Sequence, residues 1–403
     1  MTEGLLLVGL LIASFVAYNI GGSSTGPAFG PAIGADVLSK SAAAALMSIF
    51  FFAGAWTIGR RVVTTLGQDL LYESSLFTLE YSILVLLLIG TGLLLGNVSG
   101  APASTSMTAV GAIVGLGVAA GELRWAVVGE IVSWWLISPV IGFWAAVMIG
   151  RYLYPRIDRV IAIDRTEGPL LTVDRRGPIP VPTRGPNTTT RELIGIAVLV
   201  GIGCLMAFSA GTSNIANAIA PLVGSGRLGM NRGILIGSAA VAVGAFTIAR
   251  RTMESLGNDI TDLPLTAAIV VAVVSSGVVI ALSAAGIPAS FVIISTVTIV
   301  GLGWGRATRT VTVADAVRGR RSPSVSVGAL AEDRGSPTVG DPRVDDSVNG
   351  AVESIGDESP DDLPASSDLF DPGTTARVVA MQNVVPILAT VGSYLTFEFV
   401  IGV

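Results

Sequence analysis

Small neutral polar residues interrupt long apolar runs at four places in the chain. The four groups are Ser23, Ser24 and Thr25; Ser104, Thr105 and Ser106; Ser213 and Asn214; and Ser290. Each group stands near glycine or proline, which break helices and so expose the free N–H groups of a new helix start. Hydroxyl, amide and backbone N–H donors at the positive end of a helix bind anions. A pocket built from all four groups would suit a small tetrahedral oxyanion such as phosphate or sulfate.

The elements that must position these groups are membrane helices. Of the 403 residues, 51% are hydrophobic and 13% are charged, and the mean hydropathy is +0.73. Soluble proteins contain about 25% charged residues, and several apolar runs here approach the ~20 residues that span a bilayer. We therefore predict an all-α polytopic membrane protein, with the lipid bilayer as a partner and no nucleic acid. The first apolar segment, 4–20, follows no basic region, so we expect it to be retained as a helix.

The composition also excludes several chemistries. The chain has no histidine, and its single cysteine, Cys204, lies in an apolar run. Histidine proton relays, intramolecular disulfides and most transition-metal sites are therefore excluded. No pair of carboxylates accompanies a nucleophile inside the apolar segments. We expect no enzyme activity, no cofactor and no structural metal.

The second half of the chain repeats the first. At an offset of 190 residues, GGSSTGPAFGPAIG (21–34) aligns with GTSNIANAIAPLVG (211–224), and GAWTIGRRVVTTLGQD (54–69) aligns with GAFTIARRTMESLGND (244–259). At an offset of 186, APASTSMTAVGAIVGLG (101–117) aligns with IPASFVIISTVTIVGLG (287–303). Pro139 pairs with Pro386 in the last apolar segment of each copy. Charged, glycine and proline positions keep register over these alignments, which indicates an internal repeat.

The repeat predicts an architecture. Each copy has about five crossings if a broken segment counts as one, and an odd number inverts the second copy relative to the first. We predict two inverted repeats with broken or re-entrant helices and about 10–12 transmembrane segments in total, as in secondary transporters. Repeat 1 covers 1–154, and repeat 2 covers 192–304 and 377–403. Breaks around one central cavity are expected at 21–34, 98–106, 211–224 and 284–290.

Two hydrophilic segments set the expected orientation. Residues 155–191 carry seven arginines against four acidic residues, which predicts a cytoplasmic loop. Residues 305–376 form the second segment, and its part from 311 onward holds thirteen acidic residues and five arginines with few large apolar residues. Such a composition predicts a disordered linker. With both segments in the cytoplasm, both termini are expected on the extracellular side of the cell membrane.

Two features allow a second interpretation. The small residues at the breaks could instead permit close packing of continuous helices. The arginine pairs Arg60–Arg61 and Arg250–Arg251 could attract an anion, but anchoring at the membrane interface is the simpler role. Inversion of the repeats places the two pairs on opposite faces, so one pair must violate the positive-inside bias.

Several of these stretches resemble the PiT family of inorganic phosphate transporters. They are SSTGPAFGPAIGAD (23–36), GAWTIGRRVVTTLG (54–67), PAST (102–105) with GAIVG (111–115), and SNIANAIAPLVGSG (213–226). The resemblance covers nearly the whole chain outside the hydrophilic segments. It implies an ion-coupled carrier that takes up phosphate with sodium or protons. It also places Ser23, Ser24, Pro27, Ser213, Asn214 and Asn217 on the family's Asn-Asp…Asn signature, and Ser104, Thr105, Ser106 and Ser290 on its Pro-x-Ser-Thr-Thr turns.

The chain departs from the family where negative charge is expected. Ser24 and Asn214 replace the two signature aspartates, and Phe291 and Val292 stand where hydroxyl residues would follow Ser290. A sodium ion would then depend on neutral oxygens, and the candidate ligands for a coupling ion, Na⁺ or H⁺, are Asn19, Asn214 and Asn217. The stretch YNIGGSSTGPAFG (18–30) is also similar to the sulfate-permease branch, which carries an Asn-Ile-Gly signature.

The leading hypothesis is an ion-coupled secondary transporter that takes up phosphate by alternating access. Sulfate is the alternative substrate, because the lost carboxylates favour it. A passive anion channel is a further alternative, but the chain lacks the ring of charged residues that channel filters use. A homodimer is the assembly to be tested.

Overall fold

The protein is described by a computed structural model over residues 2–34, 37–98, 103–161, 171–174, 181–184, 189–248, 265–310 and 372–403. The helices are α1 (Thr2–Gly34), α2 (Lys40–Gly54), α3 (Arg60–Thr64), α4 (Leu79–Val98), α5 (Thr105–Ala119), α6 (Trp125–Met148), α7 (Tyr154–Ile161), α8 (Thr190–Gly224), α9 (Met230–Thr247), α11 (Leu265–Ala284), α12 (Phe291–Ala307) and α14 (Pro372–Leu395). π-Helical turns extend several of them, namely η1 (Ala55–Gly59), η2 (Thr65–Asp69), η4 (Ile149–Leu153) and η8 (Thr396–Ile401).

The described helices are those of a polytopic membrane protein. Eight of them are long and apolar enough to cross a bilayer, and two shorter apolar helices, α5 and α12, accompany them. Large apolar side chains face outward, for example Leu136 on α6 at 71% exposure, because lipid takes the place of water around such a bundle. The predicted all-α membrane class is confirmed. One short addition is the antiparallel pair β1 (Leu171–Asp174) and β2 (Val181–Arg184).

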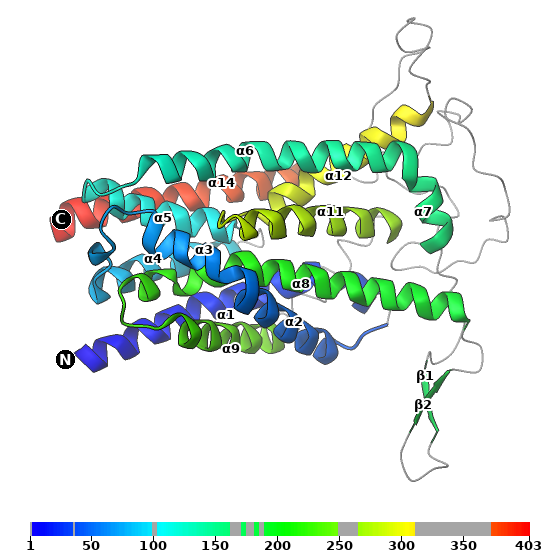
Figure 1. Cartoon of the computed structure of the whole chain (residues 1–403), viewed down its shortest axis with the longest axis horizontal. Helices are drawn as coiled ribbons and strands as arrows, with labels where there is room; N and C mark the ends of the chain where they lie inside the picture. Colours follow the sequence, from blue (N-terminus) through cyan, green and yellow to red (C-terminus); the bar gives the residue numbers. More distant parts are fainter. Residues whose placement is uncertain are drawn as a thin grey trace, which may run out of the picture.

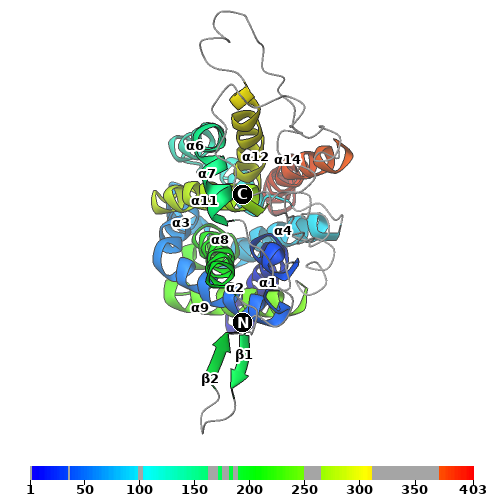
Figure 2. The same ribbon diagram turned by 90° about the vertical axis from the view of Figure 1, so that its right-hand side faces the viewer.

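The helices lie roughly parallel along the long axis of the molecule (Figure 1). Viewed along that axis, α1, α2, α8 and α9 form one half of the bundle, and α6, α12 and α14 form the other (Figure 2). Both termini lie at one end, here called the termini end, whereas β1 and β2 lie at the opposite end, here called the strand end (Figure 1). α1 runs away from the termini end, and α8 runs toward it (Figure 1).

The expected breaks at 21–34 and 211–224 are wrong, because both segments are helical. They form the second half of α1 and of α8, which continue through Pro27, Pro31 and Pro221. Prolines are tolerated in membrane helices when neighbouring groups satisfy the freed carbonyls. The glycines of these segments serve close packing instead. A Cβ at Gly21 would lie 2.0 Å from the Val241 carbonyl oxygen on α9.

The other two expected breaks are present where the structure describes them. Helix α4 ends at Val98 and α5 begins at Thr105, with Ala103 and Ser104 non-helical; residues 99–102 lie outside the described part. Helix α11 ends at Ala284 and α12 begins at Phe291. Gly286, with φ of 82°, closes α11: its N–H bonds the Ser283 carbonyl, and the Ile287 N–H bonds the Leu282 carbonyl, both at 2.9 Å. This is a Schellman ending, and Pro288 follows it.

Helices α4 and α5 form a hairpin, and so do α11 and α12. Each hairpin returns to the end of the bundle from which it enters. Leu71, which precedes α4, forms a bridge with Leu123, which follows α5. At the other end, Tyr154 belongs to one hydrophobic cluster with Ala267 at the start of α11 and Leu302 late in α12. The α4–α5 hairpin therefore enters from one end of the bundle and the α11–α12 hairpin from the other. Their non-helical segments approach each other inside the bundle.

The closest helix approaches at glycine residues occur in pairs that are related by the sequence offset of 190. A Cβ at Gly21 or at Gly211 would lie 2.0 Å from a carbonyl oxygen, that of Val241 and that of Phe51 respectively. The same holds at 2.1 Å for Gly54 against Phe208 and for Gly244 against Tyr18. Each copy thus packs its first helix on the second helix of the other copy. The second interpretation given above, close packing by small residues, explains these positions.

Some sequence expectations fall outside the described residues. These are Arg250, Arg251, residues 311–371 of the expected linker, and parts of 155–191. The first residues of that linker are described: α12 continues to Ala307, and the 3₁₀ turn η5 (Thr308–Thr310) follows it.

Candidate functional site

Polar groups from α5, α8 and the segment before α12 meet inside the bundle. The Oγ atoms of Ser106 and Ser213 lie 3.3 Å apart. Both hydroxyls lie within hydrogen-bonding distance of the Ala289 carbonyl oxygen, at 3.1 and 3.0 Å, and the Ala289 N–H donates to Ser213 Oγ at 3.1 Å. Each serine is only 1% exposed. These contacts tie both hairpins to α8.

Two asparagines extend this group along α8. Thr105 donates through Oγ1 to Asn214 Oδ1 at 2.7 Å. Asn217 donates through Nδ2 to the same oxygen at 3.3 Å and to Ser106 Oγ at 3.4 Å. We call the assembled set the polar cluster; its members are Ser104, Thr105, Ser106, Ser213, Asn214, Asn217, Ala289 and Ser290.

Asn217 brings two oxygens that lack ordinary partners. Its side chain is fully buried, and its Oδ1 has no hydrogen-bond partner among the described residues. Pro221, four residues later on α8, has no N–H, so the Asn217 carbonyl also lacks its usual helical donor. Buried oxygens without donors are costly for a protein. They are suitable ligands for a hard cation.

Each hairpin presents the start of a helix to the polar cluster. Ser104 is the N-cap of α5, and its Oγ accepts from the Met107 N–H at 3.3 Å. Ser290 is the N-cap of α12, and its side chain makes no capping bond. The first N–H groups of a helix have no internal partner, so free donors at both helix starts point toward the same region. No charged side chain belongs to the cluster, and the donors there are neutral.

Ser104, Thr105, Ser106, Ser213, Asn214, Asn217 and Ser290 were predicted from the sequence, but two contributors were not. The Ala289 carbonyl is a backbone group, which carries no signal in the residue type. Trp135 on α6 donates through Nε1 to the Pro288 carbonyl at 2.7 Å and so holds the second hairpin in place. Its only sequence signal is the WW pair at 134–135, which also fits a lipid-facing position.

The predicted residues of α1 are not joined to the polar cluster by any hydrogen bond among the described residues. Thr25 Oγ1 donates to the Gly21 carbonyl at 2.7 Å, and Ser23 Oγ donates to the Ile20 carbonyl at 3.2 Å. Ser24 is half-buried. Asn19 accepts from Asn97 Nδ2 at 3.1 Å, which links α1 to the end of α4. The hydrogen bonds therefore join three of the four expected groups, the one before α12 through Ala289, and a role for the α1 residues at the site stays a prediction.

The two arginines of the first pair, Arg60 and Arg61, make different contacts. The Arg60 guanidinium lies 4.4 Å above the ring of Trp56, and its Nε donates to the Trp56 carbonyl at 2.6 Å, as expected of an anchor. Arg61 instead donates to the Ala284 carbonyl at the C-terminal end of α11. A positive charge there stabilises the helix dipole, so Arg61 secures the hairpin that carries Ala289 and Ser290.

Two opposed re-entrant hairpins and a buried, neutral polar cluster between them define a multi-pass membrane transporter rather than a soluble binding protein. The model of the Phosphate transporter family matches residues 20–326, and the chain belongs to this family. The resemblance found in the sequence is confirmed.

Individual relatives agree with this assignment. The chain is 31% identical over 301 residues to a sulfate permease of Bacillus subtilis (strain 168), covering 74% of this chain and 77% of the relative. It is 25% identical over 389 residues to a "Putative phosphate permease" of Chlamydia trachomatis serovar D, covering 76% and 91%. Among solved structures, a sodium-dependent phosphate transporter shares the fold with a TM-score of 0.59 and 20% identity, covering 78% of this chain and 92% of that one.

Proposed function

We propose that the protein is an ion-coupled secondary transporter that takes up inorganic phosphate across the cell membrane by alternating access. The observation that carries the proposal is the convergence of two helix starts, those of α5 and α12, on the hydroxyls of Ser106 and Ser213. Helix starts and hydroxyls are donors for an oxyanion. The family membership and the fold of a sodium-dependent phosphate transporter support the same substrate.

In this structure the hydroxyl donors of the polar cluster bond to other groups of the protein. The Ser106 and Ser213 hydroxyls both point to Ala289, and both are shielded from solvent. An anion that enters would replace these internal bonds with bonds to its own oxygens. Because the two hairpins enter from opposite ends, movement of one against the other would open the cluster to one side at a time.

Coupling to a cation is supported by the oxygens of α8. Asn214 Oδ1, Asn217 Oδ1 and the Asn217 carbonyl supply neutral ligands beside the anion donors, as Na⁺ requires when no carboxylate is present. Asn19, the third candidate, lies on α1, and its side chain contacts Asn97 near the end of α4. A sodium ion next to the anion would offset its charge, since the polar cluster as defined above includes no arginine or lysine.

Sulfate is a second candidate substrate, and two observations favour it. The aspartates of the family signature are Ser24 and Asn214 here, so neither position offers a carboxylate to accept a hydrogen bond from the hydroxyl of hydrogen phosphate. The identity to the sulfate permease, 31%, also exceeds the 25% to the phosphate relative.

The orientation in the membrane follows from the proposed cytoplasmic position of residues 155–191. The termini end would then face outward, and a cysteine introduced near Val403 should react with an impermeant reagent added to intact cells.

Uptake into proteoliposomes tests the function directly. Radiolabelled phosphate and sulfate are supplied separately, with an inward sodium gradient, an inward proton gradient or no gradient. Accumulation above equilibrium under one gradient supports a coupled carrier, and the isotope that accumulates identifies the substrate. Equilibration at the same rate with and without gradients would instead indicate a passive pore. Loss of the sodium effect in Asn217→Leu, with the control variant Asn231→Leu on the surface of α9 unaffected, would place the cation on α8.

A further inference from the structure

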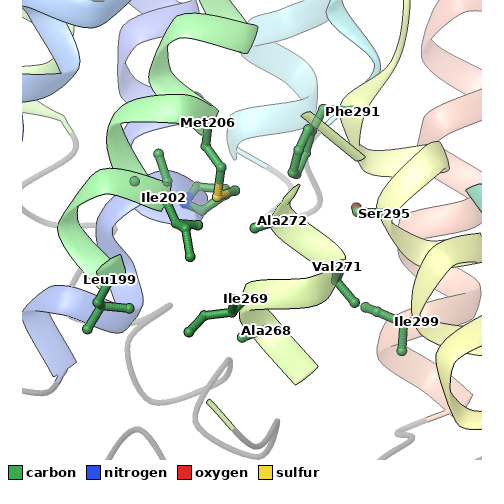
Figure 3. A pocket seen from close by; sticks show the side chains of 13 residues that line it. Leu199, Ile202, Met206, Ala268, Ile269, Val271, Ala272, Phe291, Ser295 and Ile299 are labelled. Atoms are coloured by element: carbon green, nitrogen blue, oxygen red, sulfur yellow. The ribbon is translucent and has the colours of Figure 1, made fainter. Parts of the chain in front are cut away.

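An apolar cavity lies beside the polar cluster, between α1, α8, α11 and α12 (Figure 3). Its volume is about 180 Å³. Only one of its lining side chains is polar, that of Ser295, and its Oγ donates to the Val292 carbonyl at 2.9 Å. The space next to the cluster on this side is therefore lined almost entirely by apolar side chains.

The cavity extends from the cluster toward the strand end of the molecule. Phe291, the first residue of α12, lies next to Ser290 and lines one end of the cavity together with Met206 (Figure 3). Leu199 and Ile269 line the other end (Figure 3). Both of these belong to the early turns of their helices, and α8 begins near the strand end (Figure 1).

The internal repeat shows what Phe291 replaces. The offset of 186 aligns Phe291 with Thr105, and the offset of 190 aligns Ser24 with Asn214. In the first hairpin, Thr105 bonds Asn214 at 2.7 Å and brings α8 into the polar cluster. The equivalent pair in the second hairpin is Phe291 and Ser24, in which a phenyl ring cannot donate. This substitution removes the hydroxyl donor that could bond Ser24 and places an apolar side chain in the cavity wall.

Building on the proposed function, we infer that Phe291 is a hydrophobic gate between the anion site and the strand end, and that the apolar cavity is the closed form of the path to that end. An oxyanion cannot enter a narrow apolar space without losing hydration, which is costly. Constrictions of this kind close by dewetting. The path opens when α12 moves and the cavity fills with water.

Cysteine accessibility tests the path without a transport assay. In the full chain with Cys204→Ala, single cysteines are placed at Ala272, inside the cavity, and at Val273, the next residue, whose side chain is 43% exposed on the outer face of α11. The probe is the anionic, membrane-impermeant reagent MTSES, added from either side of oriented vesicles. We expect Ala272→Cys to react from the strand end, more slowly with saturating phosphate or sulfate, whereas Val273→Cys stays unreactive in lipid. Equal rates at the two positions would overturn the path.

The gate itself is tested by a cysteine at Asn214, a member of the polar cluster on α8. Phe291→Ala should raise the reaction rate of Asn214→Cys from the strand end by about tenfold, equivalent to about 1.4 kcal/mol of barrier. Phe291→Leu, which keeps an apolar side chain, should leave the rate nearly unchanged, and Val273→Cys should remain unreactive in both variants if the bundle is intact. An unchanged rate in Phe291→Ala contradicts the gate. If these reaction rates are observed but the parent chain accumulates neither anion, the gate is supported and the proposed carrier function is contradicted.

Discussion

At the scale of single residues, the site is notable for how little charge it uses. Ser106, Ser213 and Asn217 are buried and neutral, and they contact one another, Asn214 and the Ala289 backbone. Neutral donors do not attract every anion at long range, and they bind only a ligand whose oxygens reach several donors at once. Specificity then depends on the distance between two helix starts, a property of the hairpins rather than of any one side chain.

Loss of a hydroxyl should weaken anion binding. A hydrogen bond to a charged group contributes about 1.5–3 kcal/mol, so Ser106→Ala or Thr105→Ala should raise the half-saturating anion concentration by about one to two decades. Thr105→Ser keeps the donor to Asn214 and should cost much less. Uptake at varied anion concentration measures the effect. Ser133→Ala removes an exposed hydroxyl that bonds only its own helix and is the control; a similar loss there would show that the effect is not local.

The sequence predicts the polar side chains of this site but not the backbone group that they contact. Ser104, Ser213 and Ser290 stand out because they recur at matching offsets in a chain of apolar residues. The Ala289 carbonyl has no such signal, since every residue has one. The offsets do align Phe291 with Thr105 and Ser24 with Asn214, but they do not show that Phe291 lines an apolar cavity.

At the scale of helices, the sequence does not show whether a given glycine ends a helix or permits the close packing of two helices. Clusters of glycine, serine and proline occur both where a helix ends and where two continuous helices meet closely. The 285–290 break has a left-handed Gly286 followed by Pro288, whereas Gly21 and Gly211 face carbonyl oxygens of neighbouring helices. Composition alone does not separate these cases, because the difference depends on what lies opposite each glycine.

Added bulk at a packed glycine should destabilise the bundle. A Cβ at Gly211 would lie 2.0 Å from the Phe51 carbonyl oxygen, whereas at Gly201, on the same helix, it would meet nothing within 4 Å. Overpacking typically costs about 1–3 kcal/mol, so Gly211→Ala should lower the thermal unfolding midpoint in detergent. Gly201→Ala should leave it unchanged or raise it slightly, because alanine favours helix. Equal midpoints for the two variants would contradict the packing role.

Arg61 should control the hairpin that carries Ala289. Arg61→Gln removes the charge that holds the Ala284 carbonyl, an interaction expected to contribute about 0.3–1 kcal/mol or more at a helix C-terminus. Amide hydrogen exchange in 285–290 should become faster, and anion affinity should fall. Arg60→Gln makes the same charge change one residue earlier but affects only the contact with Trp56. If both variants change exchange in 285–290 equally, net charge rather than the specific contact is responsible.

At the scale of the whole molecule, each copy is completed by the other. α1 packs on α9 and α8 on α2 through matched glycines. In the second half of the bundle, Gly115 on α5 faces the Thr390 carbonyl on α14, and Gly301 on α12 faces the Phe143 carbonyl on α6. The two copies therefore share these close interfaces, and the polar cluster lies where elements of both copies meet. A carrier that opens to alternate sides requires two arrangements of similar energy, which paired interfaces of this kind can supply.

The acidic segment should be dispensable for this assembly. Residues 311–371 hold few large apolar residues and many charges, so they cannot bury a core. The helix that follows, α14, is secured by contacts that the segment does not supply: Ser393 donates to the Ala112 carbonyl at 2.6 Å, and Gly111 faces the Pro386 carbonyl. Replacing 316–366 with a glycine–serine linker of equal length should keep membrane insertion, thermal stability and anion uptake close to those of the parent chain. As a control, the same replacement combined with Gly115→Leu, which clashes with the Thr390 carbonyl, should lose all three. Loss of uptake after the linker replacement alone would show that the segment contributes a docked element to the transporter.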